Sequence, residues 1–461
     1  MTIKTPIIPQ KQTFAKVQAP HEVNQKAICV FAATGFFLDT DTYWKDQVVL
    51  PAAAINKLDD NGFLLESKPW FQWYNAPKER PFQEVVEEFS ELFKTIVSEQ
   101  IAERSVILPL SGGLDSRTQA IVLKELQANV QAYSYQFEQG YNETRIAKQV
   151  ANQCGFSFDA FTIPKGYLWD KIDAMLAMNQ GYSDFCSPRQ LAILNQLKSY
   201  QGVFSLGHWG DVLFDDMGVA EDSTIDEQTQ QLIKKIVKRG GLKLAQTLWQ
   251  AWQLEGNFYD YFYARIQSLL QQIDIPHSAN ARLRAFKSLY WAPQWTSINL
   301  SVFEAAHPIT LPYYDDRMCK FICEIPERYL SARQIQIAYI KQKAPDLAKL
   351  TWELYHPCNL YNYKRYYTYK GLPGRLQHSL QYRVKRLFGK PTIQRNWELQ
   401  FLGKDNDNHL QQALFSDEFK TLVPIEVTET TYNGFKSENQ LHYAHGVNML
   451  LTLAKWYSKS T

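Results

Sequence analysis

The chain has 461 residues, 45% of them hydrophobic and 21% charged, and its net charge is +2. These values are typical of a globular protein large enough for two or three domains. A net charge this close to zero gives no electrostatic reason to expect nucleic acid or a membrane as the main partner. Residues 1–20 lack the apolar core of a signal peptide, and no run has the length of a membrane span, so we expect a cytoplasmic protein.

The six cysteines are few for this length and form no C-x-x-C pair, which predicts reduced, buried thiols. Cys319 and Cys323 lie four residues apart on a predicted helix, but two cysteines without a neighbouring histidine make a poor zinc site. Cys186 is the one candidate for the nucleophile of a thiolation enzyme, and nothing else in the sequence supports that role.

The first 80 residues carry only short apolar segments. Residues 1–25 are expected to form a loose arm, and residues 26–80 a small β-rich lobe. Its candidate strands, which are separated by turn signals such as Asp-Asp-Asn-Gly at 59–62, are 27–31, 47–50, 63–65 and 70–74.

From residue 81 the pattern changes to alternating helices and strands. An amphipathic helix is predicted over 81–104. The predicted strands are 106–110, 130–137, 158–163 and 203–206, and the helical patterns between them are 118–127, 142–154, 169–179 and 187–200. This alternation indicates right-handed crossovers and an α/β fold with a parallel twisted sheet covered by helices.

The first of these strands ends in the loop Ser-Gly-Gly-Leu-Asp-Ser at residues 111–116, which opens a helix near Ser116. Two adjacent glycines let backbone N–H groups approach one anion, and the start of the helix adds its own N–H groups and positive dipole end. Asp115 beside a phosphate site predicts a bridging Mg²⁺, because a carboxylate and a phosphate otherwise repel each other. The alternative is an ordinary turn between a strand and a helix.

The loop lacks the Gly-Lys-Ser/Thr ending of a Walker A motif. It resembles instead the pyrophosphate loop of the N-type ATP pyrophosphatases, which include asparagine synthetases, NAD synthetase, GMP synthetase and thiolation enzymes. The resemblance implies an adenine nucleotide alpha-hydrolase-like fold and a loop that holds the pyrophosphate of ATP. The implied nucleotide-binding residues are Ser111, Gly112, Gly113, Asp115, Ser116 and Gly207.

A second loop follows the fourth predicted strand and reads Gly-His-Trp-Gly-Asp-Val-Leu-Phe at residues 207–214. Ligands of parallel sheets bind where the strands end, so this loop and the first are expected to meet. The matching element of asparagine synthetases reads Gly-Glu-Gly-x-Asp-Glu-x-Phe. By that resemblance Asp115 and Asp211 are the two metal-binding carboxylates, while His208 and Val212 replace the family's glutamates. The alternative for Asp211 is a carboxylate that only caps its loop.

His208 has three readings from the sequence. It contacts a phosphate or an acidic substrate, it acts as a general base with a pKa near neutrality, or it only fills space. Because it stands where the family places an acidic group next to the substrate, either the substrate differs or the chemistry is weakened.

The remainder of the chain gives weaker signals. Residues 221–301 are predicted to be helical, and 311–316 resemble the family's Pro-Phe-Leu-Asp element. The stretch 344–352 resembles the segment before the family's catalytic lysine, but the register gives no clear lysine, with Tyr355 or Lys364 nearest. These later motifs are most similar to asparagine synthetase-like proteins of bacterial surface-polysaccharide clusters that lack a glutaminase.

Residues 361–390 carry eight Lys or Arg residues and no acidic residue, with leucines at helical spacing. This basic segment has three readings: a helix packed by its apolar face, a lid over a polyanionic substrate, or a peripheral contact with an anionic membrane surface. Its tyrosines would also suit single-stranded nucleic acid, but no nucleic-acid module accompanies it. An apolar helix near 441–457 is expected to dock on the core.

Together the patterns predict an arm at 1–25, a lobe at 26–80 that resembles a vestigial glutaminase, an ATP pyrophosphatase domain at 81–355, and a basic segment with helices at 356–461. The resemblance implies an ATP- and Mg²⁺-dependent ligase that adenylates a small-molecule carboxylate and then forms an amide. Glutaminases of the family start with a cysteine nucleophile, and position 2 here is Thr2. Ammonia must therefore be free, come from a separate glutaminase, or be replaced by another amine. The competing hypothesis is a non-catalytic nucleotide-binding scaffold.

Overall fold

In the computed structural model, which describes residues 1–142, 144–368 and 392–460, a five-stranded parallel sheet forms the centre of residues 81–355. Its strands are β6 (Val106–Pro109), β7 (Val130–Phe137), β8 (Ser157–Ile163), β9 (Val203–Ser205) and β10 (Ile309–Thr310). They lie in the order β10-β9-β6-β7-β8, and every neighbouring pair is parallel. The predicted α/β class is confirmed, and β10 is an edge strand that the sequence pattern did not indicate.

This strand order places the direction change of the chain between β6 and β9. The chain moves outward from β6 to β7 and β8, then returns to lay β9 on the other side of β6. Ligands of open parallel sheets bind in the crevice outside the carboxyl ends of the two strands at such a switch point. The fold therefore brings the loops after β6 and β9 together, as the sequence predicted.

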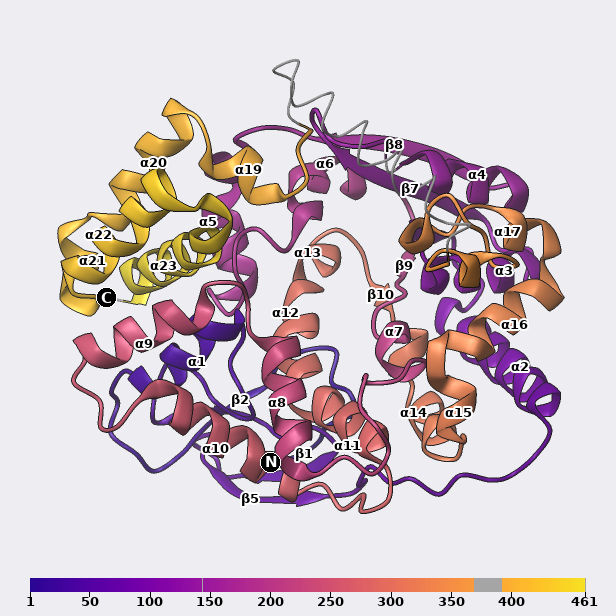
Figure 1. Cartoon of the computed structure of the whole chain (residues 1–461), viewed down its shortest axis with the longest axis horizontal. Helices are drawn as coiled ribbons and strands as arrows, with labels where there is room; N and C mark the ends of the chain where they lie inside the picture. The colour runs from indigo at the N-terminus through magenta and orange to yellow at the C-terminus, as the bar shows by residue number, and fades with distance from the viewer. Residues whose placement is uncertain (143, 369–391, 461) are drawn as a thin grey trace.

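Helices cover both faces of the sheet, and Figure 1 shows α2 (Phe82–Ile101), α3 (Leu114–Glu125) and α16 (Gln334–Lys343) gathered on one side of the molecule. The amphipathic pattern of α2 is confirmed, because most of its apolar side chains are buried and only Phe82 and Leu92 are half-buried. The other helices of the sheet region are α4 (Thr144–Cys154), α5 (Tyr167–Asn179), α6 (Leu194–Lys198), α7 (Gly210–Leu213), α14 (Asp316–Cys323), α15 (Glu327–Leu330) and α17 (Pro345–Lys349).

The N-terminal region is strand-rich but differs in detail from the prediction. Its strands are β1 (Thr2–Lys4), β2 (Phe14–Lys16), β3 (Gln47–Val49), β4 (Ala54–Leu58) and β5 (Leu64–Pro69). Residues 1–25 are not a loose arm, because β1 pairs with β4 and β2 pairs with β3. The expected strand at 27–31 is wrong: these residues belong to helix α1 (Gln25–Thr34), which the Asn24 side chain caps at its start and Gly35 ends in a left-handed conformation.

The segment 221–301 is helical, as predicted, and wraps between the N-terminal region and the sheet. It contains α8 (Ile225–Ile236), α9 (Gly241–Ala251), α10 (Phe258–Gln271), α11 (Ala279–Phe286), a π-helix η2 (Lys287–Thr296), α12 (Ser297–Asn299) and, just after it, α13 (Ser301–Glu304). π-Helices are rare and often occur at functional sites.

The C-terminal part is helical and packs against the N-terminal region, as Figure 1 shows for α1 and α23. Its helices are α19 (Asn396–Phe401), α20 (Lys404–Leu414), α21 (Asp417–Leu422), α22 (Ile425–Asn433) and α23 (Gln440–Ser460). The ring of Trp456 stacks on Tyr43 with centroids 3.7 Å apart, so the predicted final helix does dock on the core. The short segments η1 (Arg189–Ile193), η3 (Pro312–Tyr314), η4 (Ser331–Arg333), η5 (Glu353–Tyr355), η6 (Tyr363–Arg365) and η8 (Gly434–Glu438) complete the described elements.

Most of the predicted basic amphipathic segment, 369–390, lies outside the described residues, so its three readings stay predictions. Within the described ranges, we find no helix that combines the length and the apolar character needed to cross a bilayer.

Candidate functional site

The loop after β6 is held in shape by its own serines. The Ser111 backbone N–H donates to the Ser116 hydroxyl at 3.2 Å, and the Gly113 N–H donates to the Ser111 hydroxyl at 3.1 Å. Helix α3 begins at Leu114 rather than near Ser116, which brings Asp115 into its first turn. The loop therefore presents backbone N–H groups and the positive end of a helix of 12 residues at one place, as an anion site requires.

The loop after β9 packs directly against Asp115. A Cβ atom at Gly210 would lie 2.1 Å from the Asp115 Oδ1, and one at Gly207 would lie 3.0 Å from the Asp115 Cβ. Position 210 therefore accepts no side chain. The two loops meet as predicted, and the contact is close enough to couple the position of one loop to the other.

Trp209 occupies the position of the second glycine in the resembling motif, and it has a φ of +78°. A bulky residue rarely adopts this left-handed conformation, which explains why the family's motif has glycine there. The indole N–H of Trp209 donates to the Ser288 hydroxyl at 3.0 Å. This hydrogen bond and the burial of the ring hold the strained loop in place.

Asp115 is paired with Arg333, which the sequence did not single out. The Arg333 guanidinium donates to Asp115 Oδ1, and the Gln336 amide donates to the same oxygen at 2.9 Å. Burial raises the pKa of Asp115, Arg333 opposes that rise, and the neighbouring charge of Asp211 adds to it. Asp211 is exposed, and its carboxylate makes no hydrogen bond or ion pair within the described ranges.

His208 lines the cavity between the two loops. Its Nδ1 atom is buried and has no hydrogen-bond partner among the described residues. Burial lowers the pKa of His208 from its ordinary 6.5 to about 4, against a smaller opposite effect of Asp211. The near-neutral pKa expected for a general base is therefore wrong in this environment, because the sequence did not reveal how deeply the ring is buried. A neutral imidazole remains able to donate or accept one hydrogen bond at a ligand.

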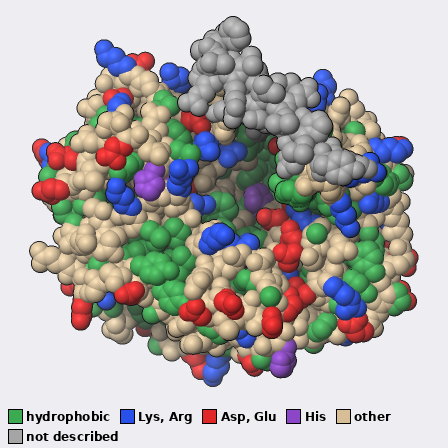
Figure 2. Space-filling model, viewed as in Figure 1, with side chains coloured by type: hydrophobic (Ala, Val, Ile, Leu, Met, Phe, Trp, Pro, Cys, Tyr) green, Lys and Arg blue, Asp and Glu red, His purple; other side chains and the backbone are tan. Residues whose placement is uncertain are grey.

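The cavity has a volume of about 400 Å³. Its walls come from both loops and from side chains that lie far away in the sequence. They are Ser111, Asp115, Ser116, Gly207 and His208 from the loops, Ser134 and Tyr135 at the end of β7, Arg189 and Gln190 from η1, and Phe303 and Glu353. Figure 2 shows a hollow in the middle of this face, where Figure 1 places β9 and α13, with acidic, basic and histidine side chains around it.

Arg189 supplies a positive charge that sequence reasoning missed. Its guanidinium lies over the Phe137 ring at 5.2 Å and makes no ion pair or hydrogen bond with the described residues. An arginine that lines a cavity without a protein partner is well suited to bind a carboxylate or phosphate through two parallel hydrogen bonds. The only local signal was its position at the start of a short helix after Ser-Pro.

Glu353 places a carboxylate on the glycine loop. Its Oε2 atom accepts a hydrogen bond from the Gly112 N–H at 3.1 Å, and its own N–H lies 3.3 Å from the Gly112 carbonyl. A Cβ atom at Gly112 would lie 2.6 Å from the Glu353 Cβ, so glycine is needed for this approach. An anion-binding N–H is thus already bonded to a protein carboxylate.

The expected late lysine is not at Tyr355 or Lys364, neither of which lines the cavity. Tyr355 packs on the Trp352 ring at 4.5 Å instead. A buried lysine close to the second loop is Lys287, whose ammonium lies 5.6 Å from the Trp209 ring and 4.6 Å from the Trp291 ring. Burial lowers the pKa of Lys287 to about 8, while Asp211 acts in the opposite direction.

The cysteines provide no competing chemistry. Burial raises the pKa of Cys186 well above its ordinary value, which disfavours the thiolate that a thiolation nucleophile needs. Cys319 and Cys323 are both buried on α14, and no group of three or more His, Cys, Asp or Glu residues converges as a metal site in the part of the chain that the structure describes.

Comparison with known proteins places this site in a family. No curated protein sequence matches the chain. Among solved structures, a glutamine-dependent NAD⁺ synthetase from Acinetobacter baumannii in complex with ADP is 15% identical, with 41% of each chain covered and a TM-score of 0.20. An NMN synthetase from Francisella tularensis is 14% identical, with 45% of this chain and 93% of that chain covered and a TM-score of 0.22. TM-scores of this size carry no weight for activity.

The chain thus spans about two-fifths of the Acinetobacter enzyme's length. The family model of asparagine synthase, by contrast, matches residues 88–458, which is most of the chain and includes both loops and the C-terminal helices. The chain belongs to the asparagine synthase family, a family of ATP-dependent carbon–nitrogen ligases.

Proposed function

We propose that this chain is an ATP-dependent amide-forming ligase. The observation that carries the proposal is the meeting of two glycine loops at the switch point of the sheet, with Asp115 and Asp211 side by side. In the first step an oxygen of the substrate carboxylate attacks the α-phosphorus of ATP, and the bond to the bridging oxygen breaks to release pyrophosphate. In the second step an amine attacks the acyl carbon, AMP leaves, and the amine loses a proton to water or AMP.

The loop at 111–116 would hold the pyrophosphate through its backbone N–H groups and the serine hydroxyls. Arg333 offers positive charge beside Asp115 and Asp211, so part of the charge of the phosphates is neutralised by the protein itself. Catalysis of this kind depends mostly on positioning and charge stabilisation rather than on a covalent intermediate with the protein.

The residues fit a Mg²⁺ ion that arrives with ATP. Mg²⁺ commonly binds through one or two carboxylates together with phosphate oxygens. Asp115 Oδ1 accepts hydrogen bonds from Arg333 and Gln336, while its Oδ2 and the carboxylate of the exposed Asp211 have no hydrogen-bond partner within the described ranges. When bound, the ion would neutralise phosphate charge; the protein would contribute those two carboxylates to hold it.

Two lining residues, His208 and Arg189, favour an anionic substrate, while the two carboxylates of the lining, Asp115 and Glu353, lie on the glycine loop or bond to it. His208 is neutral where the family's motif has an acidic residue, and Arg189, which has no ion pair among the described residues, brings a positive charge to the same cavity. A substrate ammonium would find no free carboxylate at His208, whereas a second carboxylate or a phosphate would find Arg189. We therefore propose a small acid with an additional anionic group, such as a uronic or phosphorylated acid of surface-polysaccharide synthesis.

The possible sources of nitrogen follow from the absence of a glutaminase cysteine nucleophile at position 2. With Thr2 at position 2 and no cysteine there, the amine would be free ammonia, ammonia from a separate glutaminase, or an organic amine. A cytoplasmic location and a peripheral membrane contact through 361–390 remain part of the proposal.

The test is pyrophosphate release from ATP and Mg²⁺ with a panel of monoacids, diacids and phosphorylated acids. We expect release that depends on one acid and is lost in Asp115→Asn. Arg189→Gln should raise the KM for that acid at least tenfold without changing the affinity for ATP, and Arg189→Lys should restore much of it. If the KM for the acid in pyrophosphate release is the same in the Arg189 variants as in the wild type, the proposal of an anionic substrate is refuted.

A non-catalytic scaffold is the second candidate, favoured by the carboxylate of Glu353 on the phosphate loop. Under that hypothesis no acid in the panel yields pyrophosphate, whether or not ATP binds. Tight ATP binding together with an inactive Glu353→Gln variant would support the scaffold over the ligase.

A further inference from the structure

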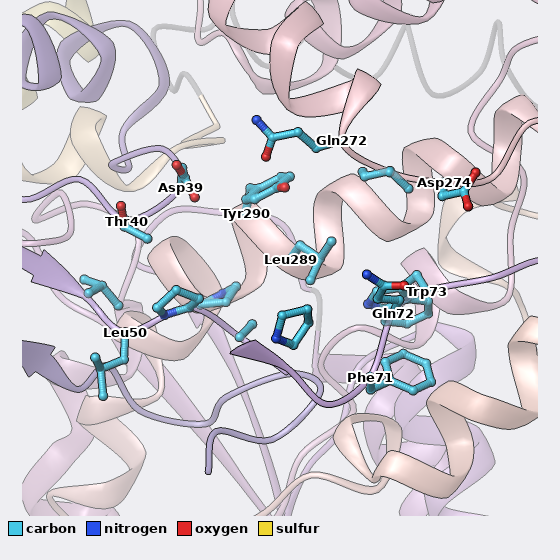
Figure 3. Close-up of a pocket in the computed structure, with 16 residues that line it drawn as sticks. Asp39, Thr40, Leu50, Phe71, Gln72, Trp73, Gln272, Asp274, Leu289 and Tyr290 are labelled. Carbon is cyan, nitrogen blue, oxygen red and sulfur yellow. The ribbon is translucent and has the colours of Figure 1, made fainter. Parts of the chain in front are cut away.

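A second cavity lies away from the two loops, between the N-terminal region and the segment 272–293. It has a volume of about 320 Å³. Figure 3 shows its walls: Phe71 and Trp73 after β5 on one side, Leu289 and Tyr290 of the π-helix η2 between, and Asp39 and Asp274 toward opposite ends. None of these residues lines the nucleotide cavity.

The lining of this second cavity is apolar with a negative charge. Its described lining residues include two aspartates and no lysine, arginine or histidine. Aromatic rings of Phe71, Trp73 and Tyr290 face the cavity, and rings attract cations electrostatically as well as apolar groups. A ligand with a positive charge and a flat or aliphatic body matches both properties.

Asp39 shares its positively charged partner, Arg265, with a second carboxylate. Arg265 is bound to Asp41 at 2.6 Å and lies 4.0 Å from Asp39, so one guanidinium faces two carboxylates. Burial raises the pKa of Asp39 to about 6, and the nearby charge of Asp41 contributes to the rise. The Asp39 carbonyl accepts a hydrogen bond from the Gln294 amide at 2.6 Å, which fixes this residue at the cavity.

One further polar group of the lining has no hydrogen-bond partner among the described residues. The indole N–H of Trp73 is buried and makes no hydrogen bond within the described residues, although the residue is 5% exposed. Buried donors without a partner are uncommon in proteins and point to a ligand or water that is bound in use.

We infer that this cavity is a binding site for an organic amine, that is, a primary ammonium on an aromatic or aliphatic body. The ammonium pairs with Asp39 or Asp274, and the body lies against Tyr290, Trp73 and Phe71. The site is separate from ATP chemistry, so the inference stands whether or not the proposed ligase reaction is correct.

The π-helix η2 connects this site to the nucleotide loops. Leu289 and Tyr290 face the amine cavity, while Trp291 of the same helix packs against Trp209 with ring centroids 6.3 Å apart. An occupant of the amine cavity therefore rests on the helix that supports the Asp211 loop.

The test is to titrate amine and control probes into the full chain without ATP and to measure binding by tryptophan fluorescence and by calorimetry. The probes are tyramine, its uncharged counterpart 4-ethylphenol and its acidic counterpart 4-hydroxyphenylacetate. We expect saturable binding of tyramine, at least tenfold weaker binding of 4-ethylphenol and no binding of the acid. Equal binding of the three probes, a preference for the acid, or no binding of tyramine would overturn the inference.

Variants assign the site. Asp39→Asn and Asp274→Asn should each weaken tyramine binding at least threefold, and the double variant at least tenfold. Asp274 is exposed and has no ion pair in the described ranges, so its variant should fold even where Asp39→Asn does not. Asp222→Asn, an exposed aspartate outside the cavity, is the matched control. If the double variant binds tyramine as the wild type does, the amine lies elsewhere and the inference fails.

Discussion

Removal of the Glu353 carboxylate should tighten ATP binding. The structure places Oε2 of Glu353 at 3.1 Å from the Gly112 N–H, inside the loop that the family uses for phosphates. A phosphate that takes this N–H must first displace the carboxylate and then lie close to its negative charge. Glu353→Gln keeps the shape of the side chain and removes the charge.

Two effects set the size of the change. A hydrogen bond to a charged group contributes about 1.5–3 kcal/mol when buried, and Glu353 is exposed, so the lower part of that range or less applies. Repulsion between two unit charges about 4 Å apart is about 1 kcal/mol in water and about 4 kcal/mol near a protein surface. Because the free side chain can turn away into solvent, we expect about 1–2 kcal/mol in total, or about five- to thirtyfold tighter binding.

The measurement is a calorimetric titration of ATP with and without Mg²⁺. Glu84→Gln, an exposed glutamate at the start of α2, controls for the change in net charge. Weaker ATP binding in Glu353→Gln would refute the reasoning, because it would make this carboxylate part of the nucleotide site, for example through the metal ion. An equal increase in ATP affinity in Glu84→Gln would mean that the change in net charge, and not the position of Glu353, causes the effect.

Three other changes test the site. Arg333→Gln leaves the largely buried Asp115 without its cation and should destabilise the fold by about 2–3 kcal/mol in urea unfolding, while it weakens ATP binding. Gly210→Ala puts a Cβ 2.1 Å from Asp115 Oδ1 and should lower ATP affinity at least tenfold, whereas stability measured by thermal unfolding falls less than in Arg333→Gln. His208→Gln should flatten the fall in stability between pH 6.5 and 4, as measured by urea unfolding.

Local patterns were enough to predict the central sheet. Residues 130–137 were predicted as a strand and are β7 without change, and the helices around it begin within a few residues of their expected positions. The pattern failed at α1 because eight of its ten residues are buried on all sides. Such a helix has no polar face, so its short apolar run cannot be told from a strand by periodicity.

The site residues also fall into two groups, those that could be predicted from the local sequence and those that could not. Both loops lie directly after strands and carry glycines and aspartates, so their chemistry could be read locally. Arg333 and Glu353 lie 218 and 241 positions along the chain from Asp115 and Gly112, the loop residues they contact, and Arg189 lies 73 positions after Ser116. Nothing near them in the chain marks them as site residues, because only the tertiary fold brings Arg189 and Glu353 to the cavity and Arg333 to Asp115.

The pH dependence of stability follows from the buried His208. In the unfolded chain this imidazole takes up a proton near pH 6.5, whereas in the folded protein its pKa is lowered to about 4. The contribution of the neutral His208 to the free energy of unfolding is therefore fully present above pH 6.5 and is lost as the pH falls from 6.5 to 4. A difference of two to three pKa units corresponds to about 3 kcal/mol. His445, whose pKa is also lowered to about 4, adds a similar fall to both proteins, so only the difference between wild type and His208→Gln reports on His208. Parallel stability curves for the two proteins would mean that the pKa of His208 is the same in the folded and the unfolded chain, so that below pH 6.5 an anionic ligand would meet two cations in this cavity rather than Arg189 alone.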